Sequence, residues 1–69
     1  MQYYENLRKA RVKAKMNQSE VADRLNTTQY QISKYELGKQ ELTVPRFKEL
    51  CLLYNVSADD ILEIQKSER

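Results

Sequence analysis

Hydrophobic positions in residues 18–37 recur every three or four residues in two groups, which predicts two short helices joined by a tight turn. The positions that share one face within each group are Val21, Ala22 and Leu25, followed by Ile32 and Tyr35. Residues 26–28 separate the groups, and Asn26 tolerates the left-handed backbone conformation that a chain reversal needs. The pattern predicts that the second helix stands clear of the body of the domain.

Capping residues mark the starts of both helices. Asn17 followed by Glu20 has the spacing of a capping box ahead of the first helix, and Thr28 with Gln31 repeats it ahead of the second. Gly38 is the expected C-terminal cap of the second helix. Two N-terminal caps and one C-terminal cap within this short segment define where the turn lies. This is the spacing of a helix-turn-helix, a motif whose second helix enters the DNA major groove.

Three further helices complete the pattern. The first covers residues 3–15 and has a thin hydrophobic stripe that includes Leu7. Thr43 caps a later helix that tolerates Pro45 in its first turn and ends near Asn55. The residues expected on the buried face of that helix are Phe47, Leu50, Cys51 and Tyr54.

Ser57 and Asp60 open a fifth helix, which carries the hydrophobic residues Ile61, Leu62 and Ile64. Residues 65–69 are polar and are expected to fray. The core predicted from the whole pattern consists of Leu7, Ala14, Val21, Ala22, Leu25, Ile32, Tyr35, Phe47, Leu50, Val56 and Ile61. We therefore predict an all-α fold, with residues 1–69 forming one compact five-helix domain.

The composition limits the fold classes and the kinds of functional site that the chain can have. The chain has 69 residues, one Gly and one Pro, which favours one small helical domain over a sheet. It has one Cys and no His, so we expect no disulfide within the chain, no metal, no cofactor and no catalytic site. Cys51 lies in a hydrophobic run and is expected to be buried. No segment is apolar enough to span a bilayer, so a cytoplasmic protein is expected, located on the nucleoid when bound to DNA.

The charge is distributed unevenly. Residues 1–48 contain ten Lys and Arg against five Asp and Glu, whereas residues 49–69 contain two against five. The basic part includes the helix-turn-helix, as expected of a domain that meets a polyanion at one end. Runs such as Arg8, Lys9 and Arg11 are nevertheless usually the solvated face of a helix.

Residues throughout the chain stand at the spacing of a known family: Leu7, Arg11, Gln18, Ala22, Leu25, Ile32, Ser33, Glu36, Gly38, Lys39, Val56, Ser57 and Asp59. By these residues the chain resembles the lambda-repressor-like helix-turn-helix family of the Cro/C1, or XRE, type. It departs from the family pattern at Asn26 and Thr27, where Gly and an aliphatic residue are usual, and at Leu42, where Pro is usual. The resemblance implies a five-helix DNA-binding domain of a prokaryotic or phage transcriptional regulator that binds as a dimer.

The second helix of the motif, here called the recognition helix, carries the candidate base-reading residues. These are Thr28, Gln29, Tyr30, Gln31 and, one turn on, Lys34. Glutamine pairs with adenine, lysine donates to guanine, and a threonine methyl or tyrosine ring packs on a thymine methyl. The alternative is that these side chains are only the exposed face of a helix. Tyr30 has two possible roles, which are to contact DNA or to cover a neighbouring helix.

Candidate phosphate contacts lie at helix starts and in the loop after the recognition helix: Asn17, Gln18, Lys39, Gln40, Thr43 and Arg46. Gln18 resembles the family glutamine that contacts phosphate and braces the recognition helix. Arg46 could equally be a solvated loop residue. The resemblance also implies a partly buried ion pair between Arg11 and Glu36.

The predicted function is sequence-specific binding to double-stranded DNA by a transcriptional regulator, a repressor that acts as a homodimer on a palindromic operator. Leu62 and Ile64 are candidate dimer contacts, unless they fold back onto Tyr3, Tyr4 and Leu7.

Two other functions are alternatives. One is an antitoxin-type regulator that also binds a toxin protein, although no segment for wrapping a toxin is evident. The other is a protein-interaction module that has lost DNA reading. The polar residues Gln29, Gln31 and Lys34 argue against such a module, because a docking face would be more hydrophobic.

Overall fold

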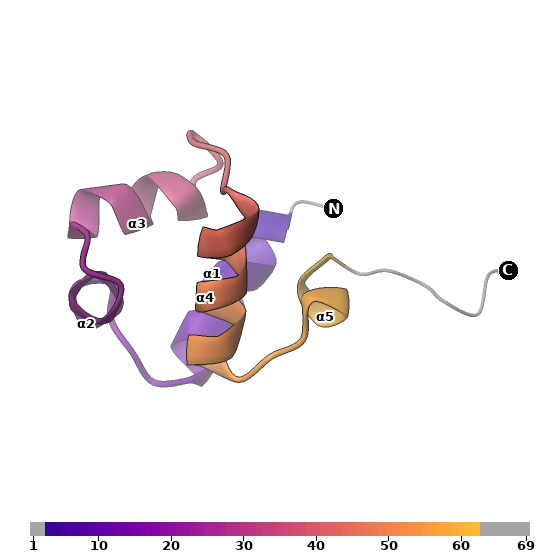
Figure 1. The fold of residues 1–69 in the computed structure, drawn as a ribbon. Coiled ribbons are helices and arrows are strands. Elements are labelled where there is room, and N and C mark those ends of the chain that lie inside the picture. The colour runs from indigo at the N-terminus through magenta and orange to yellow at the C-terminus, as the bar shows by residue number, and fades with distance from the viewer. Residues whose placement is uncertain (1–2, 63–69) are drawn as a thin grey trace, which may run out of the picture.

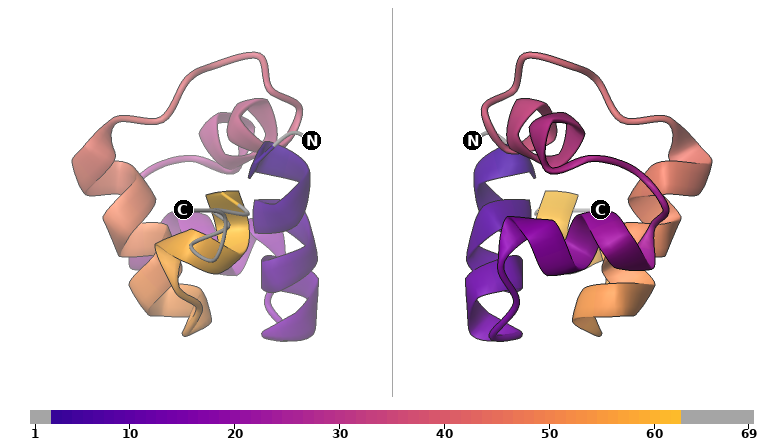
Figure 2. Two further views of the ribbon diagram at one scale, coloured as in Figure 1. Left: turned by 90° about the vertical axis from the view of Figure 1, so that its right-hand side faces the viewer. Right: turned by 90° about the vertical axis from the view of Figure 1, so that its left-hand side faces the viewer.

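The computed structural model describes residues 3–62, which form five helices and no strand, so the predicted fold class is confirmed (Figure 1). The helices are α1 (Tyr3–Lys13), α2 (Gln18–Arg24), α3 (Gln29–Glu36), α4 (Val44–Tyr54) and α5 (Ala58–Leu62). Figure 2 shows α1 and α4 as the two flanks, with α2 crossing one face between them and α5 lying on the opposite face. The predicted site residue Ile64 and the tail 65–69 lie outside the described residues.

The predicted capping residues start four of the helices. Asn17 Oδ1 accepts from the Glu20 amide at 2.8 Å while Glu20 Oε1 accepts from the Asn17 amide at 2.8 Å, which completes the capping box of α2. The hydroxyls that accept from the amide three residues on are those of Thr28 for α3, Thr43 for α4 and Ser57 for α5. Helix α4 thus begins at Val44, as its cap predicts, despite the unusual Leu42.

Each of α1 to α4 is followed by a residue with positive φ, which reverses the chain. The residues are Lys15 (62°), Asn26 (57°), Gly38 (74°) and Asn55 (59°). In each case the next amide bonds back to the carbonyl five residues earlier, as in a Schellman motif: Met16 to Arg11, Thr27 to Ala22, Lys39 to Lys34 and Val56 to Cys51. Three of the four stops are predicted from Asn or Gly. Lys15 gives no such signal in the sequence, so the predicted end of the first helix at residue 15 is wrong. The helix ends at Lys13.

The buried hydrophobic core contains most of the predicted residues. Its members are Leu7, Ala10, Val21, Ala22, Ile32, Tyr35, Leu50, Cys51, Tyr54 and Ile61. Four predicted members are only partly buried against this core, namely Ala14, Leu25, Phe47 and Val56. Ala14, Leu25 and Val56 lie beyond helix ends, and Phe47 borders a surface groove, so each keeps some contact with solvent.

Candidate nucleic-acid interface

Helix α3 lies along an outer edge of the domain, in contact with α2 and α1 (Figure 1). Of the candidate base-reading residues, Thr28, Gln29 and Tyr30 are exposed, and Gln31 and Lys34 are partly buried. Tyr30 is 70% exposed, so it does not cover a neighbouring helix. The Lys34 ammonium lies over the Tyr30 ring, 5.1 Å from its centroid.

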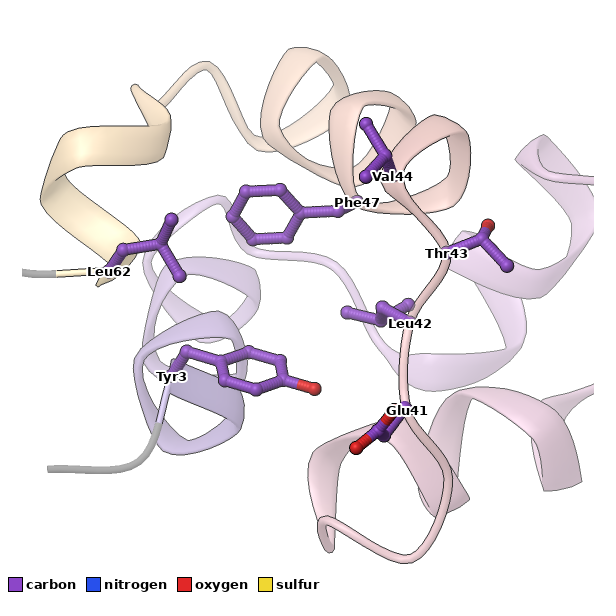
Figure 3. Close-up of a pocket in the computed structure, with 7 residues that line it drawn as sticks. All are labelled: Tyr3, Glu41, Leu42, Thr43, Val44, Phe47 and Leu62. Atoms are coloured by element: carbon purple, nitrogen blue, oxygen red, sulfur yellow. The ribbon is translucent and has the colours of Figure 1, made fainter.

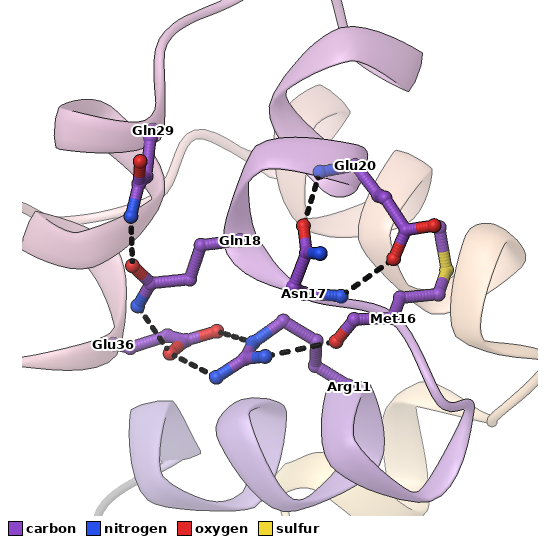
Figure 4. Close-up of polar contacts among 7 residues, drawn as sticks. All are labelled: Arg11, Met16, Asn17, Gln18, Glu20, Gln29 and Glu36. Atoms are coloured by element: carbon purple, nitrogen blue, oxygen red, sulfur yellow. Dashed lines mark hydrogen bonds and ion pairs between the residues drawn. The ribbon is translucent and has the colours of Figure 1, made fainter.

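A buried ion pair joins α1 to the end of α3 (Figure 4). Arg11 Nε donates to Glu36 Oε2 at 2.7 Å and Nη2 donates to Oε1 at 3.2 Å, with the side chains only 12% and 6% exposed. Arg11 Nη1 also donates to the Met16 carbonyl at 2.9 Å, just before α2 begins. The bidentate pair and the bond to Met16 together fix α1, the segment before α2 and the end of α3 relative to one another.

The ion pair extends to the start of the recognition helix through two glutamines (Figure 4). Gln18 Nε2 donates to Glu36 Oε1 at 3.0 Å, and Gln29 Nε2 donates to Gln18 Oε1 at 3.4 Å. Because a carboxylate only accepts, Glu36 fixes which end of the Gln18 amide faces it, and Gln18 in turn orients Gln29. The Ser19 hydroxyl donates to Gln29 Oε1 at 3.2 Å and supports the same orientation.

These bonds hold the glutamines without using all of their hydrogen-bonding capacity. An amide nitrogen carries two hydrogens and an amide oxygen has two lone pairs. The bonds to Gln18 and Ser19 use one of each on Gln29, so one donor and one acceptor remain, which is the combination that can pair with an adenine edge. Gln18 Nε2 likewise keeps one hydrogen after bonding Glu36. The family resemblance implies Gln18 as a brace, but nothing in the sequence indicates the Ser19 contact.

The candidate phosphate contacts differ in what else they do. Lys39 is exposed and Gln40 is partly buried in the loop after α3, whereas the side chains of Asn17 and Thr43 cap helices. Arg46 is not a solvated loop residue. Its Nη1 donates to the Leu25 carbonyl at 3.1 Å and to Glu49 Oε1 at 3.2 Å, which ties α4 to the end of α2.

Comparison with protein-family models gives a match to a helix-turn-helix domain over residues 4–64. The chain belongs to this helix-turn-helix family. The match agrees with the Cro/C1-type resemblance, and it supports DNA binding in gene regulation as the class of function. A comparison with curated proteins gave no match, and neither did one with solved structures. Within residues 3–62 of this helix-turn-helix domain, no helix has the length and apolarity needed to cross a membrane.

Two buried titratable groups of the domain lie in α4. Burial raises the pKa of the Cys51 thiol, so the group stays protonated and packs as a small hydrophobe. The pKa of the Tyr54 phenol is raised by burial and further by the Glu36 carboxylate, against a smaller opposing effect of Arg11. Both groups are neutral at pH 7 and pack in the hydrophobic core.

A hydrophobic groove opens between α1, α4 and α5, on the face of the domain away from α2 (Figure 3). It is lined by Tyr3, Glu41, Leu42, Thr43, Val44, Phe47 and Leu62. The Tyr3 and Phe47 rings meet edge to face, with centroids 6.4 Å apart. Leu62, a candidate dimer contact, borders the groove together with Tyr3 but stays 45% exposed. Asn6 Nδ2 holds α5 in place by donating to the Ile61 carbonyl at 2.8 Å.

Proposed function

We propose that residues 1–69 act as one domain that binds double-stranded DNA in a sequence-specific manner and represses transcription as a homodimer on a palindromic operator. The observation that carries the proposal is the chain of contacts from Arg11 through Glu36 and Gln18 to Gln29. It anchors an exposed hydrogen-bonding amide at the start of α3 to the buried core. Such rigid support is what a base-reading side chain requires.

In this proposal the exposed side of α3 lies in the major groove. Gln29 bonds adenine through its remaining donor and acceptor, and Lys34 donates to guanine. Thr28, Tyr30 and Gln31 contact neighbouring base edges or methyl groups. Repression then follows from occupancy of the operator and needs no catalytic group.

Phosphate contacts position the domain on the duplex and are independent of sequence. Gln18 uses its second amide hydrogen for a phosphate oxygen while its first stays on Glu36. Lys39 and Gln40 contact the backbone from the loop after α3. Asn17, Thr43 and Arg46 contribute weaker contacts, because their polar atoms already hold helix ends.

One recognition helix buries too little surface for tight binding, so a second copy on a half-site about 34 Å away is expected. The groove and Leu62 form a hydrophobic surface that a second copy can cover. The groove faces away from α2, so contact there leaves the start of α2 and α3 free for DNA (Figure 2). Thr43 borders both surfaces, because it lines the groove and lies in the loop that approaches the DNA backbone.

The decisive experiment measures binding to random genomic DNA fragments over a salt series and then sequences the enriched sites. With roughly six phosphate contacts per dimer, log K should fall with log salt at a slope of about −5. Gln29→Ala should change the enriched sequence, whereas Lys39→Ala should weaken all sites alike and make the slope shallower by about 1 for each phosphate that is no longer neutralised. Circular dichroism confirms that each variant is folded. Binding that does not respond to salt would exclude the proposal.

A further inference from the structure

Tyr30 and Lys34 form a pair on α3 that presents two different chemical groups side by side. They are four residues apart, so they are neighbours on one face of the helix. The distance of 5.1 Å from Lys34 Nζ to the ring centroid is within the range of a cation–π contact. The ammonium covers only part of the ring, because Tyr30 remains 70% exposed.

This pairing fixes the position of the ammonium relative to the ring. A free lysine loses rotamer entropy when it is immobilised, and the ring restrains Lys34 before any ligand is bound. A ligand group that packs on the remaining surface of the Tyr30 ring therefore lies a few ångströms from the ligand atom that accepts a hydrogen bond from the Lys34 ammonium. Adjoining bases on one strand of B-DNA are about 3.4 Å apart, so the two ligands fit neighbouring base pairs and not the same one.

The chemistry of each partner identifies its ligand. An ammonium donates to the O6 and N7 acceptors of guanine, which are the pair of acceptors that the major groove shows at a G·C pair. An exposed aromatic ring packs on a hydrophobic group, and the C5-methyl of a pyrimidine is the one that base edges present in this groove. Thymine carries this methyl, and so does 5-methylcytosine.

We propose that Tyr30 and Lys34 together read one two-base-pair step, in which a pyrimidine with a C5-methyl group adjoins a guanine. This inference rests on the proposed DNA-binding function and names the base-pair step that one part of the recognition helix binds. It also implies that, where the step contains cytosine, binding depends on methylation of that cytosine.

The test uses the full chain and the strongest site enriched from genomic DNA, which should contain a thymine next to a guanine. Replacing that thymine with deoxyuridine removes only the methyl and should weaken binding about fourfold, the value for one buried methyl-sized group. At the same position, 5-methylcytosine should bind about fourfold more tightly than cytosine. Replacing the guanine with 7-deazaguanine should weaken binding because it removes N7.

Variants assign these effects to the two side chains. Tyr30→Ala should bind the thymine and deoxyuridine sites equally, whereas Tyr30→Phe, which keeps the ring, should still distinguish them. Lys34→Met should lose the response to 7-deazaguanine. Because Tyr30 is exposed, its replacement should leave the melting temperature nearly unchanged, which circular dichroism checks.

The outcomes separate this inference from the proposed function. Salt-sensitive binding with no loss at deoxyuridine, or no gain at 5-methylcytosine over cytosine, overturns the inference and leaves DNA binding intact. Salt-sensitive binding that ignores 7-deazaguanine also overturns it, since Lys34 then serves only a phosphate. Absence of salt-sensitive binding to any fragment is instead the failure of the proposed function.

Discussion

At the scale of single residues, Glu36 links the stability of the domain to its proposed recognition surface. Its carboxylate accepts two bonds from Arg11 and one from Gln18, although the side chain is almost fully buried. A buried carboxylate that keeps three donors is well compensated, but a partner left alone is not. The same residue therefore supports the fold and, through Gln18, the orientation of Gln29.

Glu36→Ala should unfold the domain and not merely change its sequence preference. Stranding the Arg11 guanidinium in a buried site costs about 3–5 kcal/mol, which is comparable to the whole stability of a domain this small. Thermal unfolding followed by circular dichroism measures the loss. The double variant Arg11→Met, Glu36→Leu is the control and should be more stable than Glu36→Ala, because no charge is stranded. A melting temperature of Glu36→Ala equal to the wild type would refute this.

The members of this network differ in how clearly the sequence predicts them. Arg11, Gln18 and Glu36 were predicted as a pair and a brace because their spacing resembles the family. The bond from Arg46 to Leu25 was not foreseen, since its acceptor is a main-chain carbonyl exposed by the turn after α2, and no side-chain pattern reports it. Side-chain contacts that belong to a family pattern are thus easier to anticipate than contacts to backbone atoms freed by a helix end.

At the scale of helices, the sequence predicts where a helix begins more clearly than where it ends. The side chains of Asn17, Thr28, Thr43 and Ser57 form the caps that their position predicts. The end of a helix needs only one residue in the left-handed conformation and two backbone hydrogen bonds. Most residue types can adopt that conformation, although a residue with a Cβ does so at a cost in free energy. Lys15 is the example, with φ of 62° and no glycine or asparagine to mark it.

Lys15→Gly should stabilise the domain by about 0.5–1 kcal/mol. A side chain in the left-handed region costs about 1–2 kcal/mol, and the greater freedom of glycine in the unfolded chain cancels part of that gain. Urea denaturation should show a higher midpoint. Lys15→Ala is the matched control, because it removes the same charge but keeps a Cβ and should give no gain. Gly38→Ala, the reverse change, should destabilise, since its Cβ would collide with the Tyr4 ring. A lower midpoint for Lys15→Gly would contradict the strain argument.

At the scale of the whole molecule, the domain has two distinct faces. The exposed side of α3 and the start of α2 carry polar residues held by the buried ion pair, and the face formed by α1, α4 and α5 carries the hydrophobic groove (Figures 2 and 3). The first face could be predicted because its residues come from two helices that follow one another in the sequence. The groove could not, since Tyr3, Phe47 and Leu62 come from three distant segments that only the packing of α4 and α5 against α1 brings together.

Leu62→Asp should separate DNA recognition from dimer formation. Leu62 is 45% exposed, so the change should leave the monomer folded, whereas a carboxylate placed in a hydrophobic contact between copies should disrupt that contact. Sedimentation equilibrium should show a shift to monomer, and affinity for DNA with two half-sites should fall at least tenfold while affinity for a single half-site hardly changes. Leu52→Asp is the matched control, because Leu52 is 72% exposed and does not line the groove. If Leu62→Asp remains dimeric and keeps its preference for two half-sites, the second copy is held by a different surface, and the groove has no part in placing the two recognition helices on DNA.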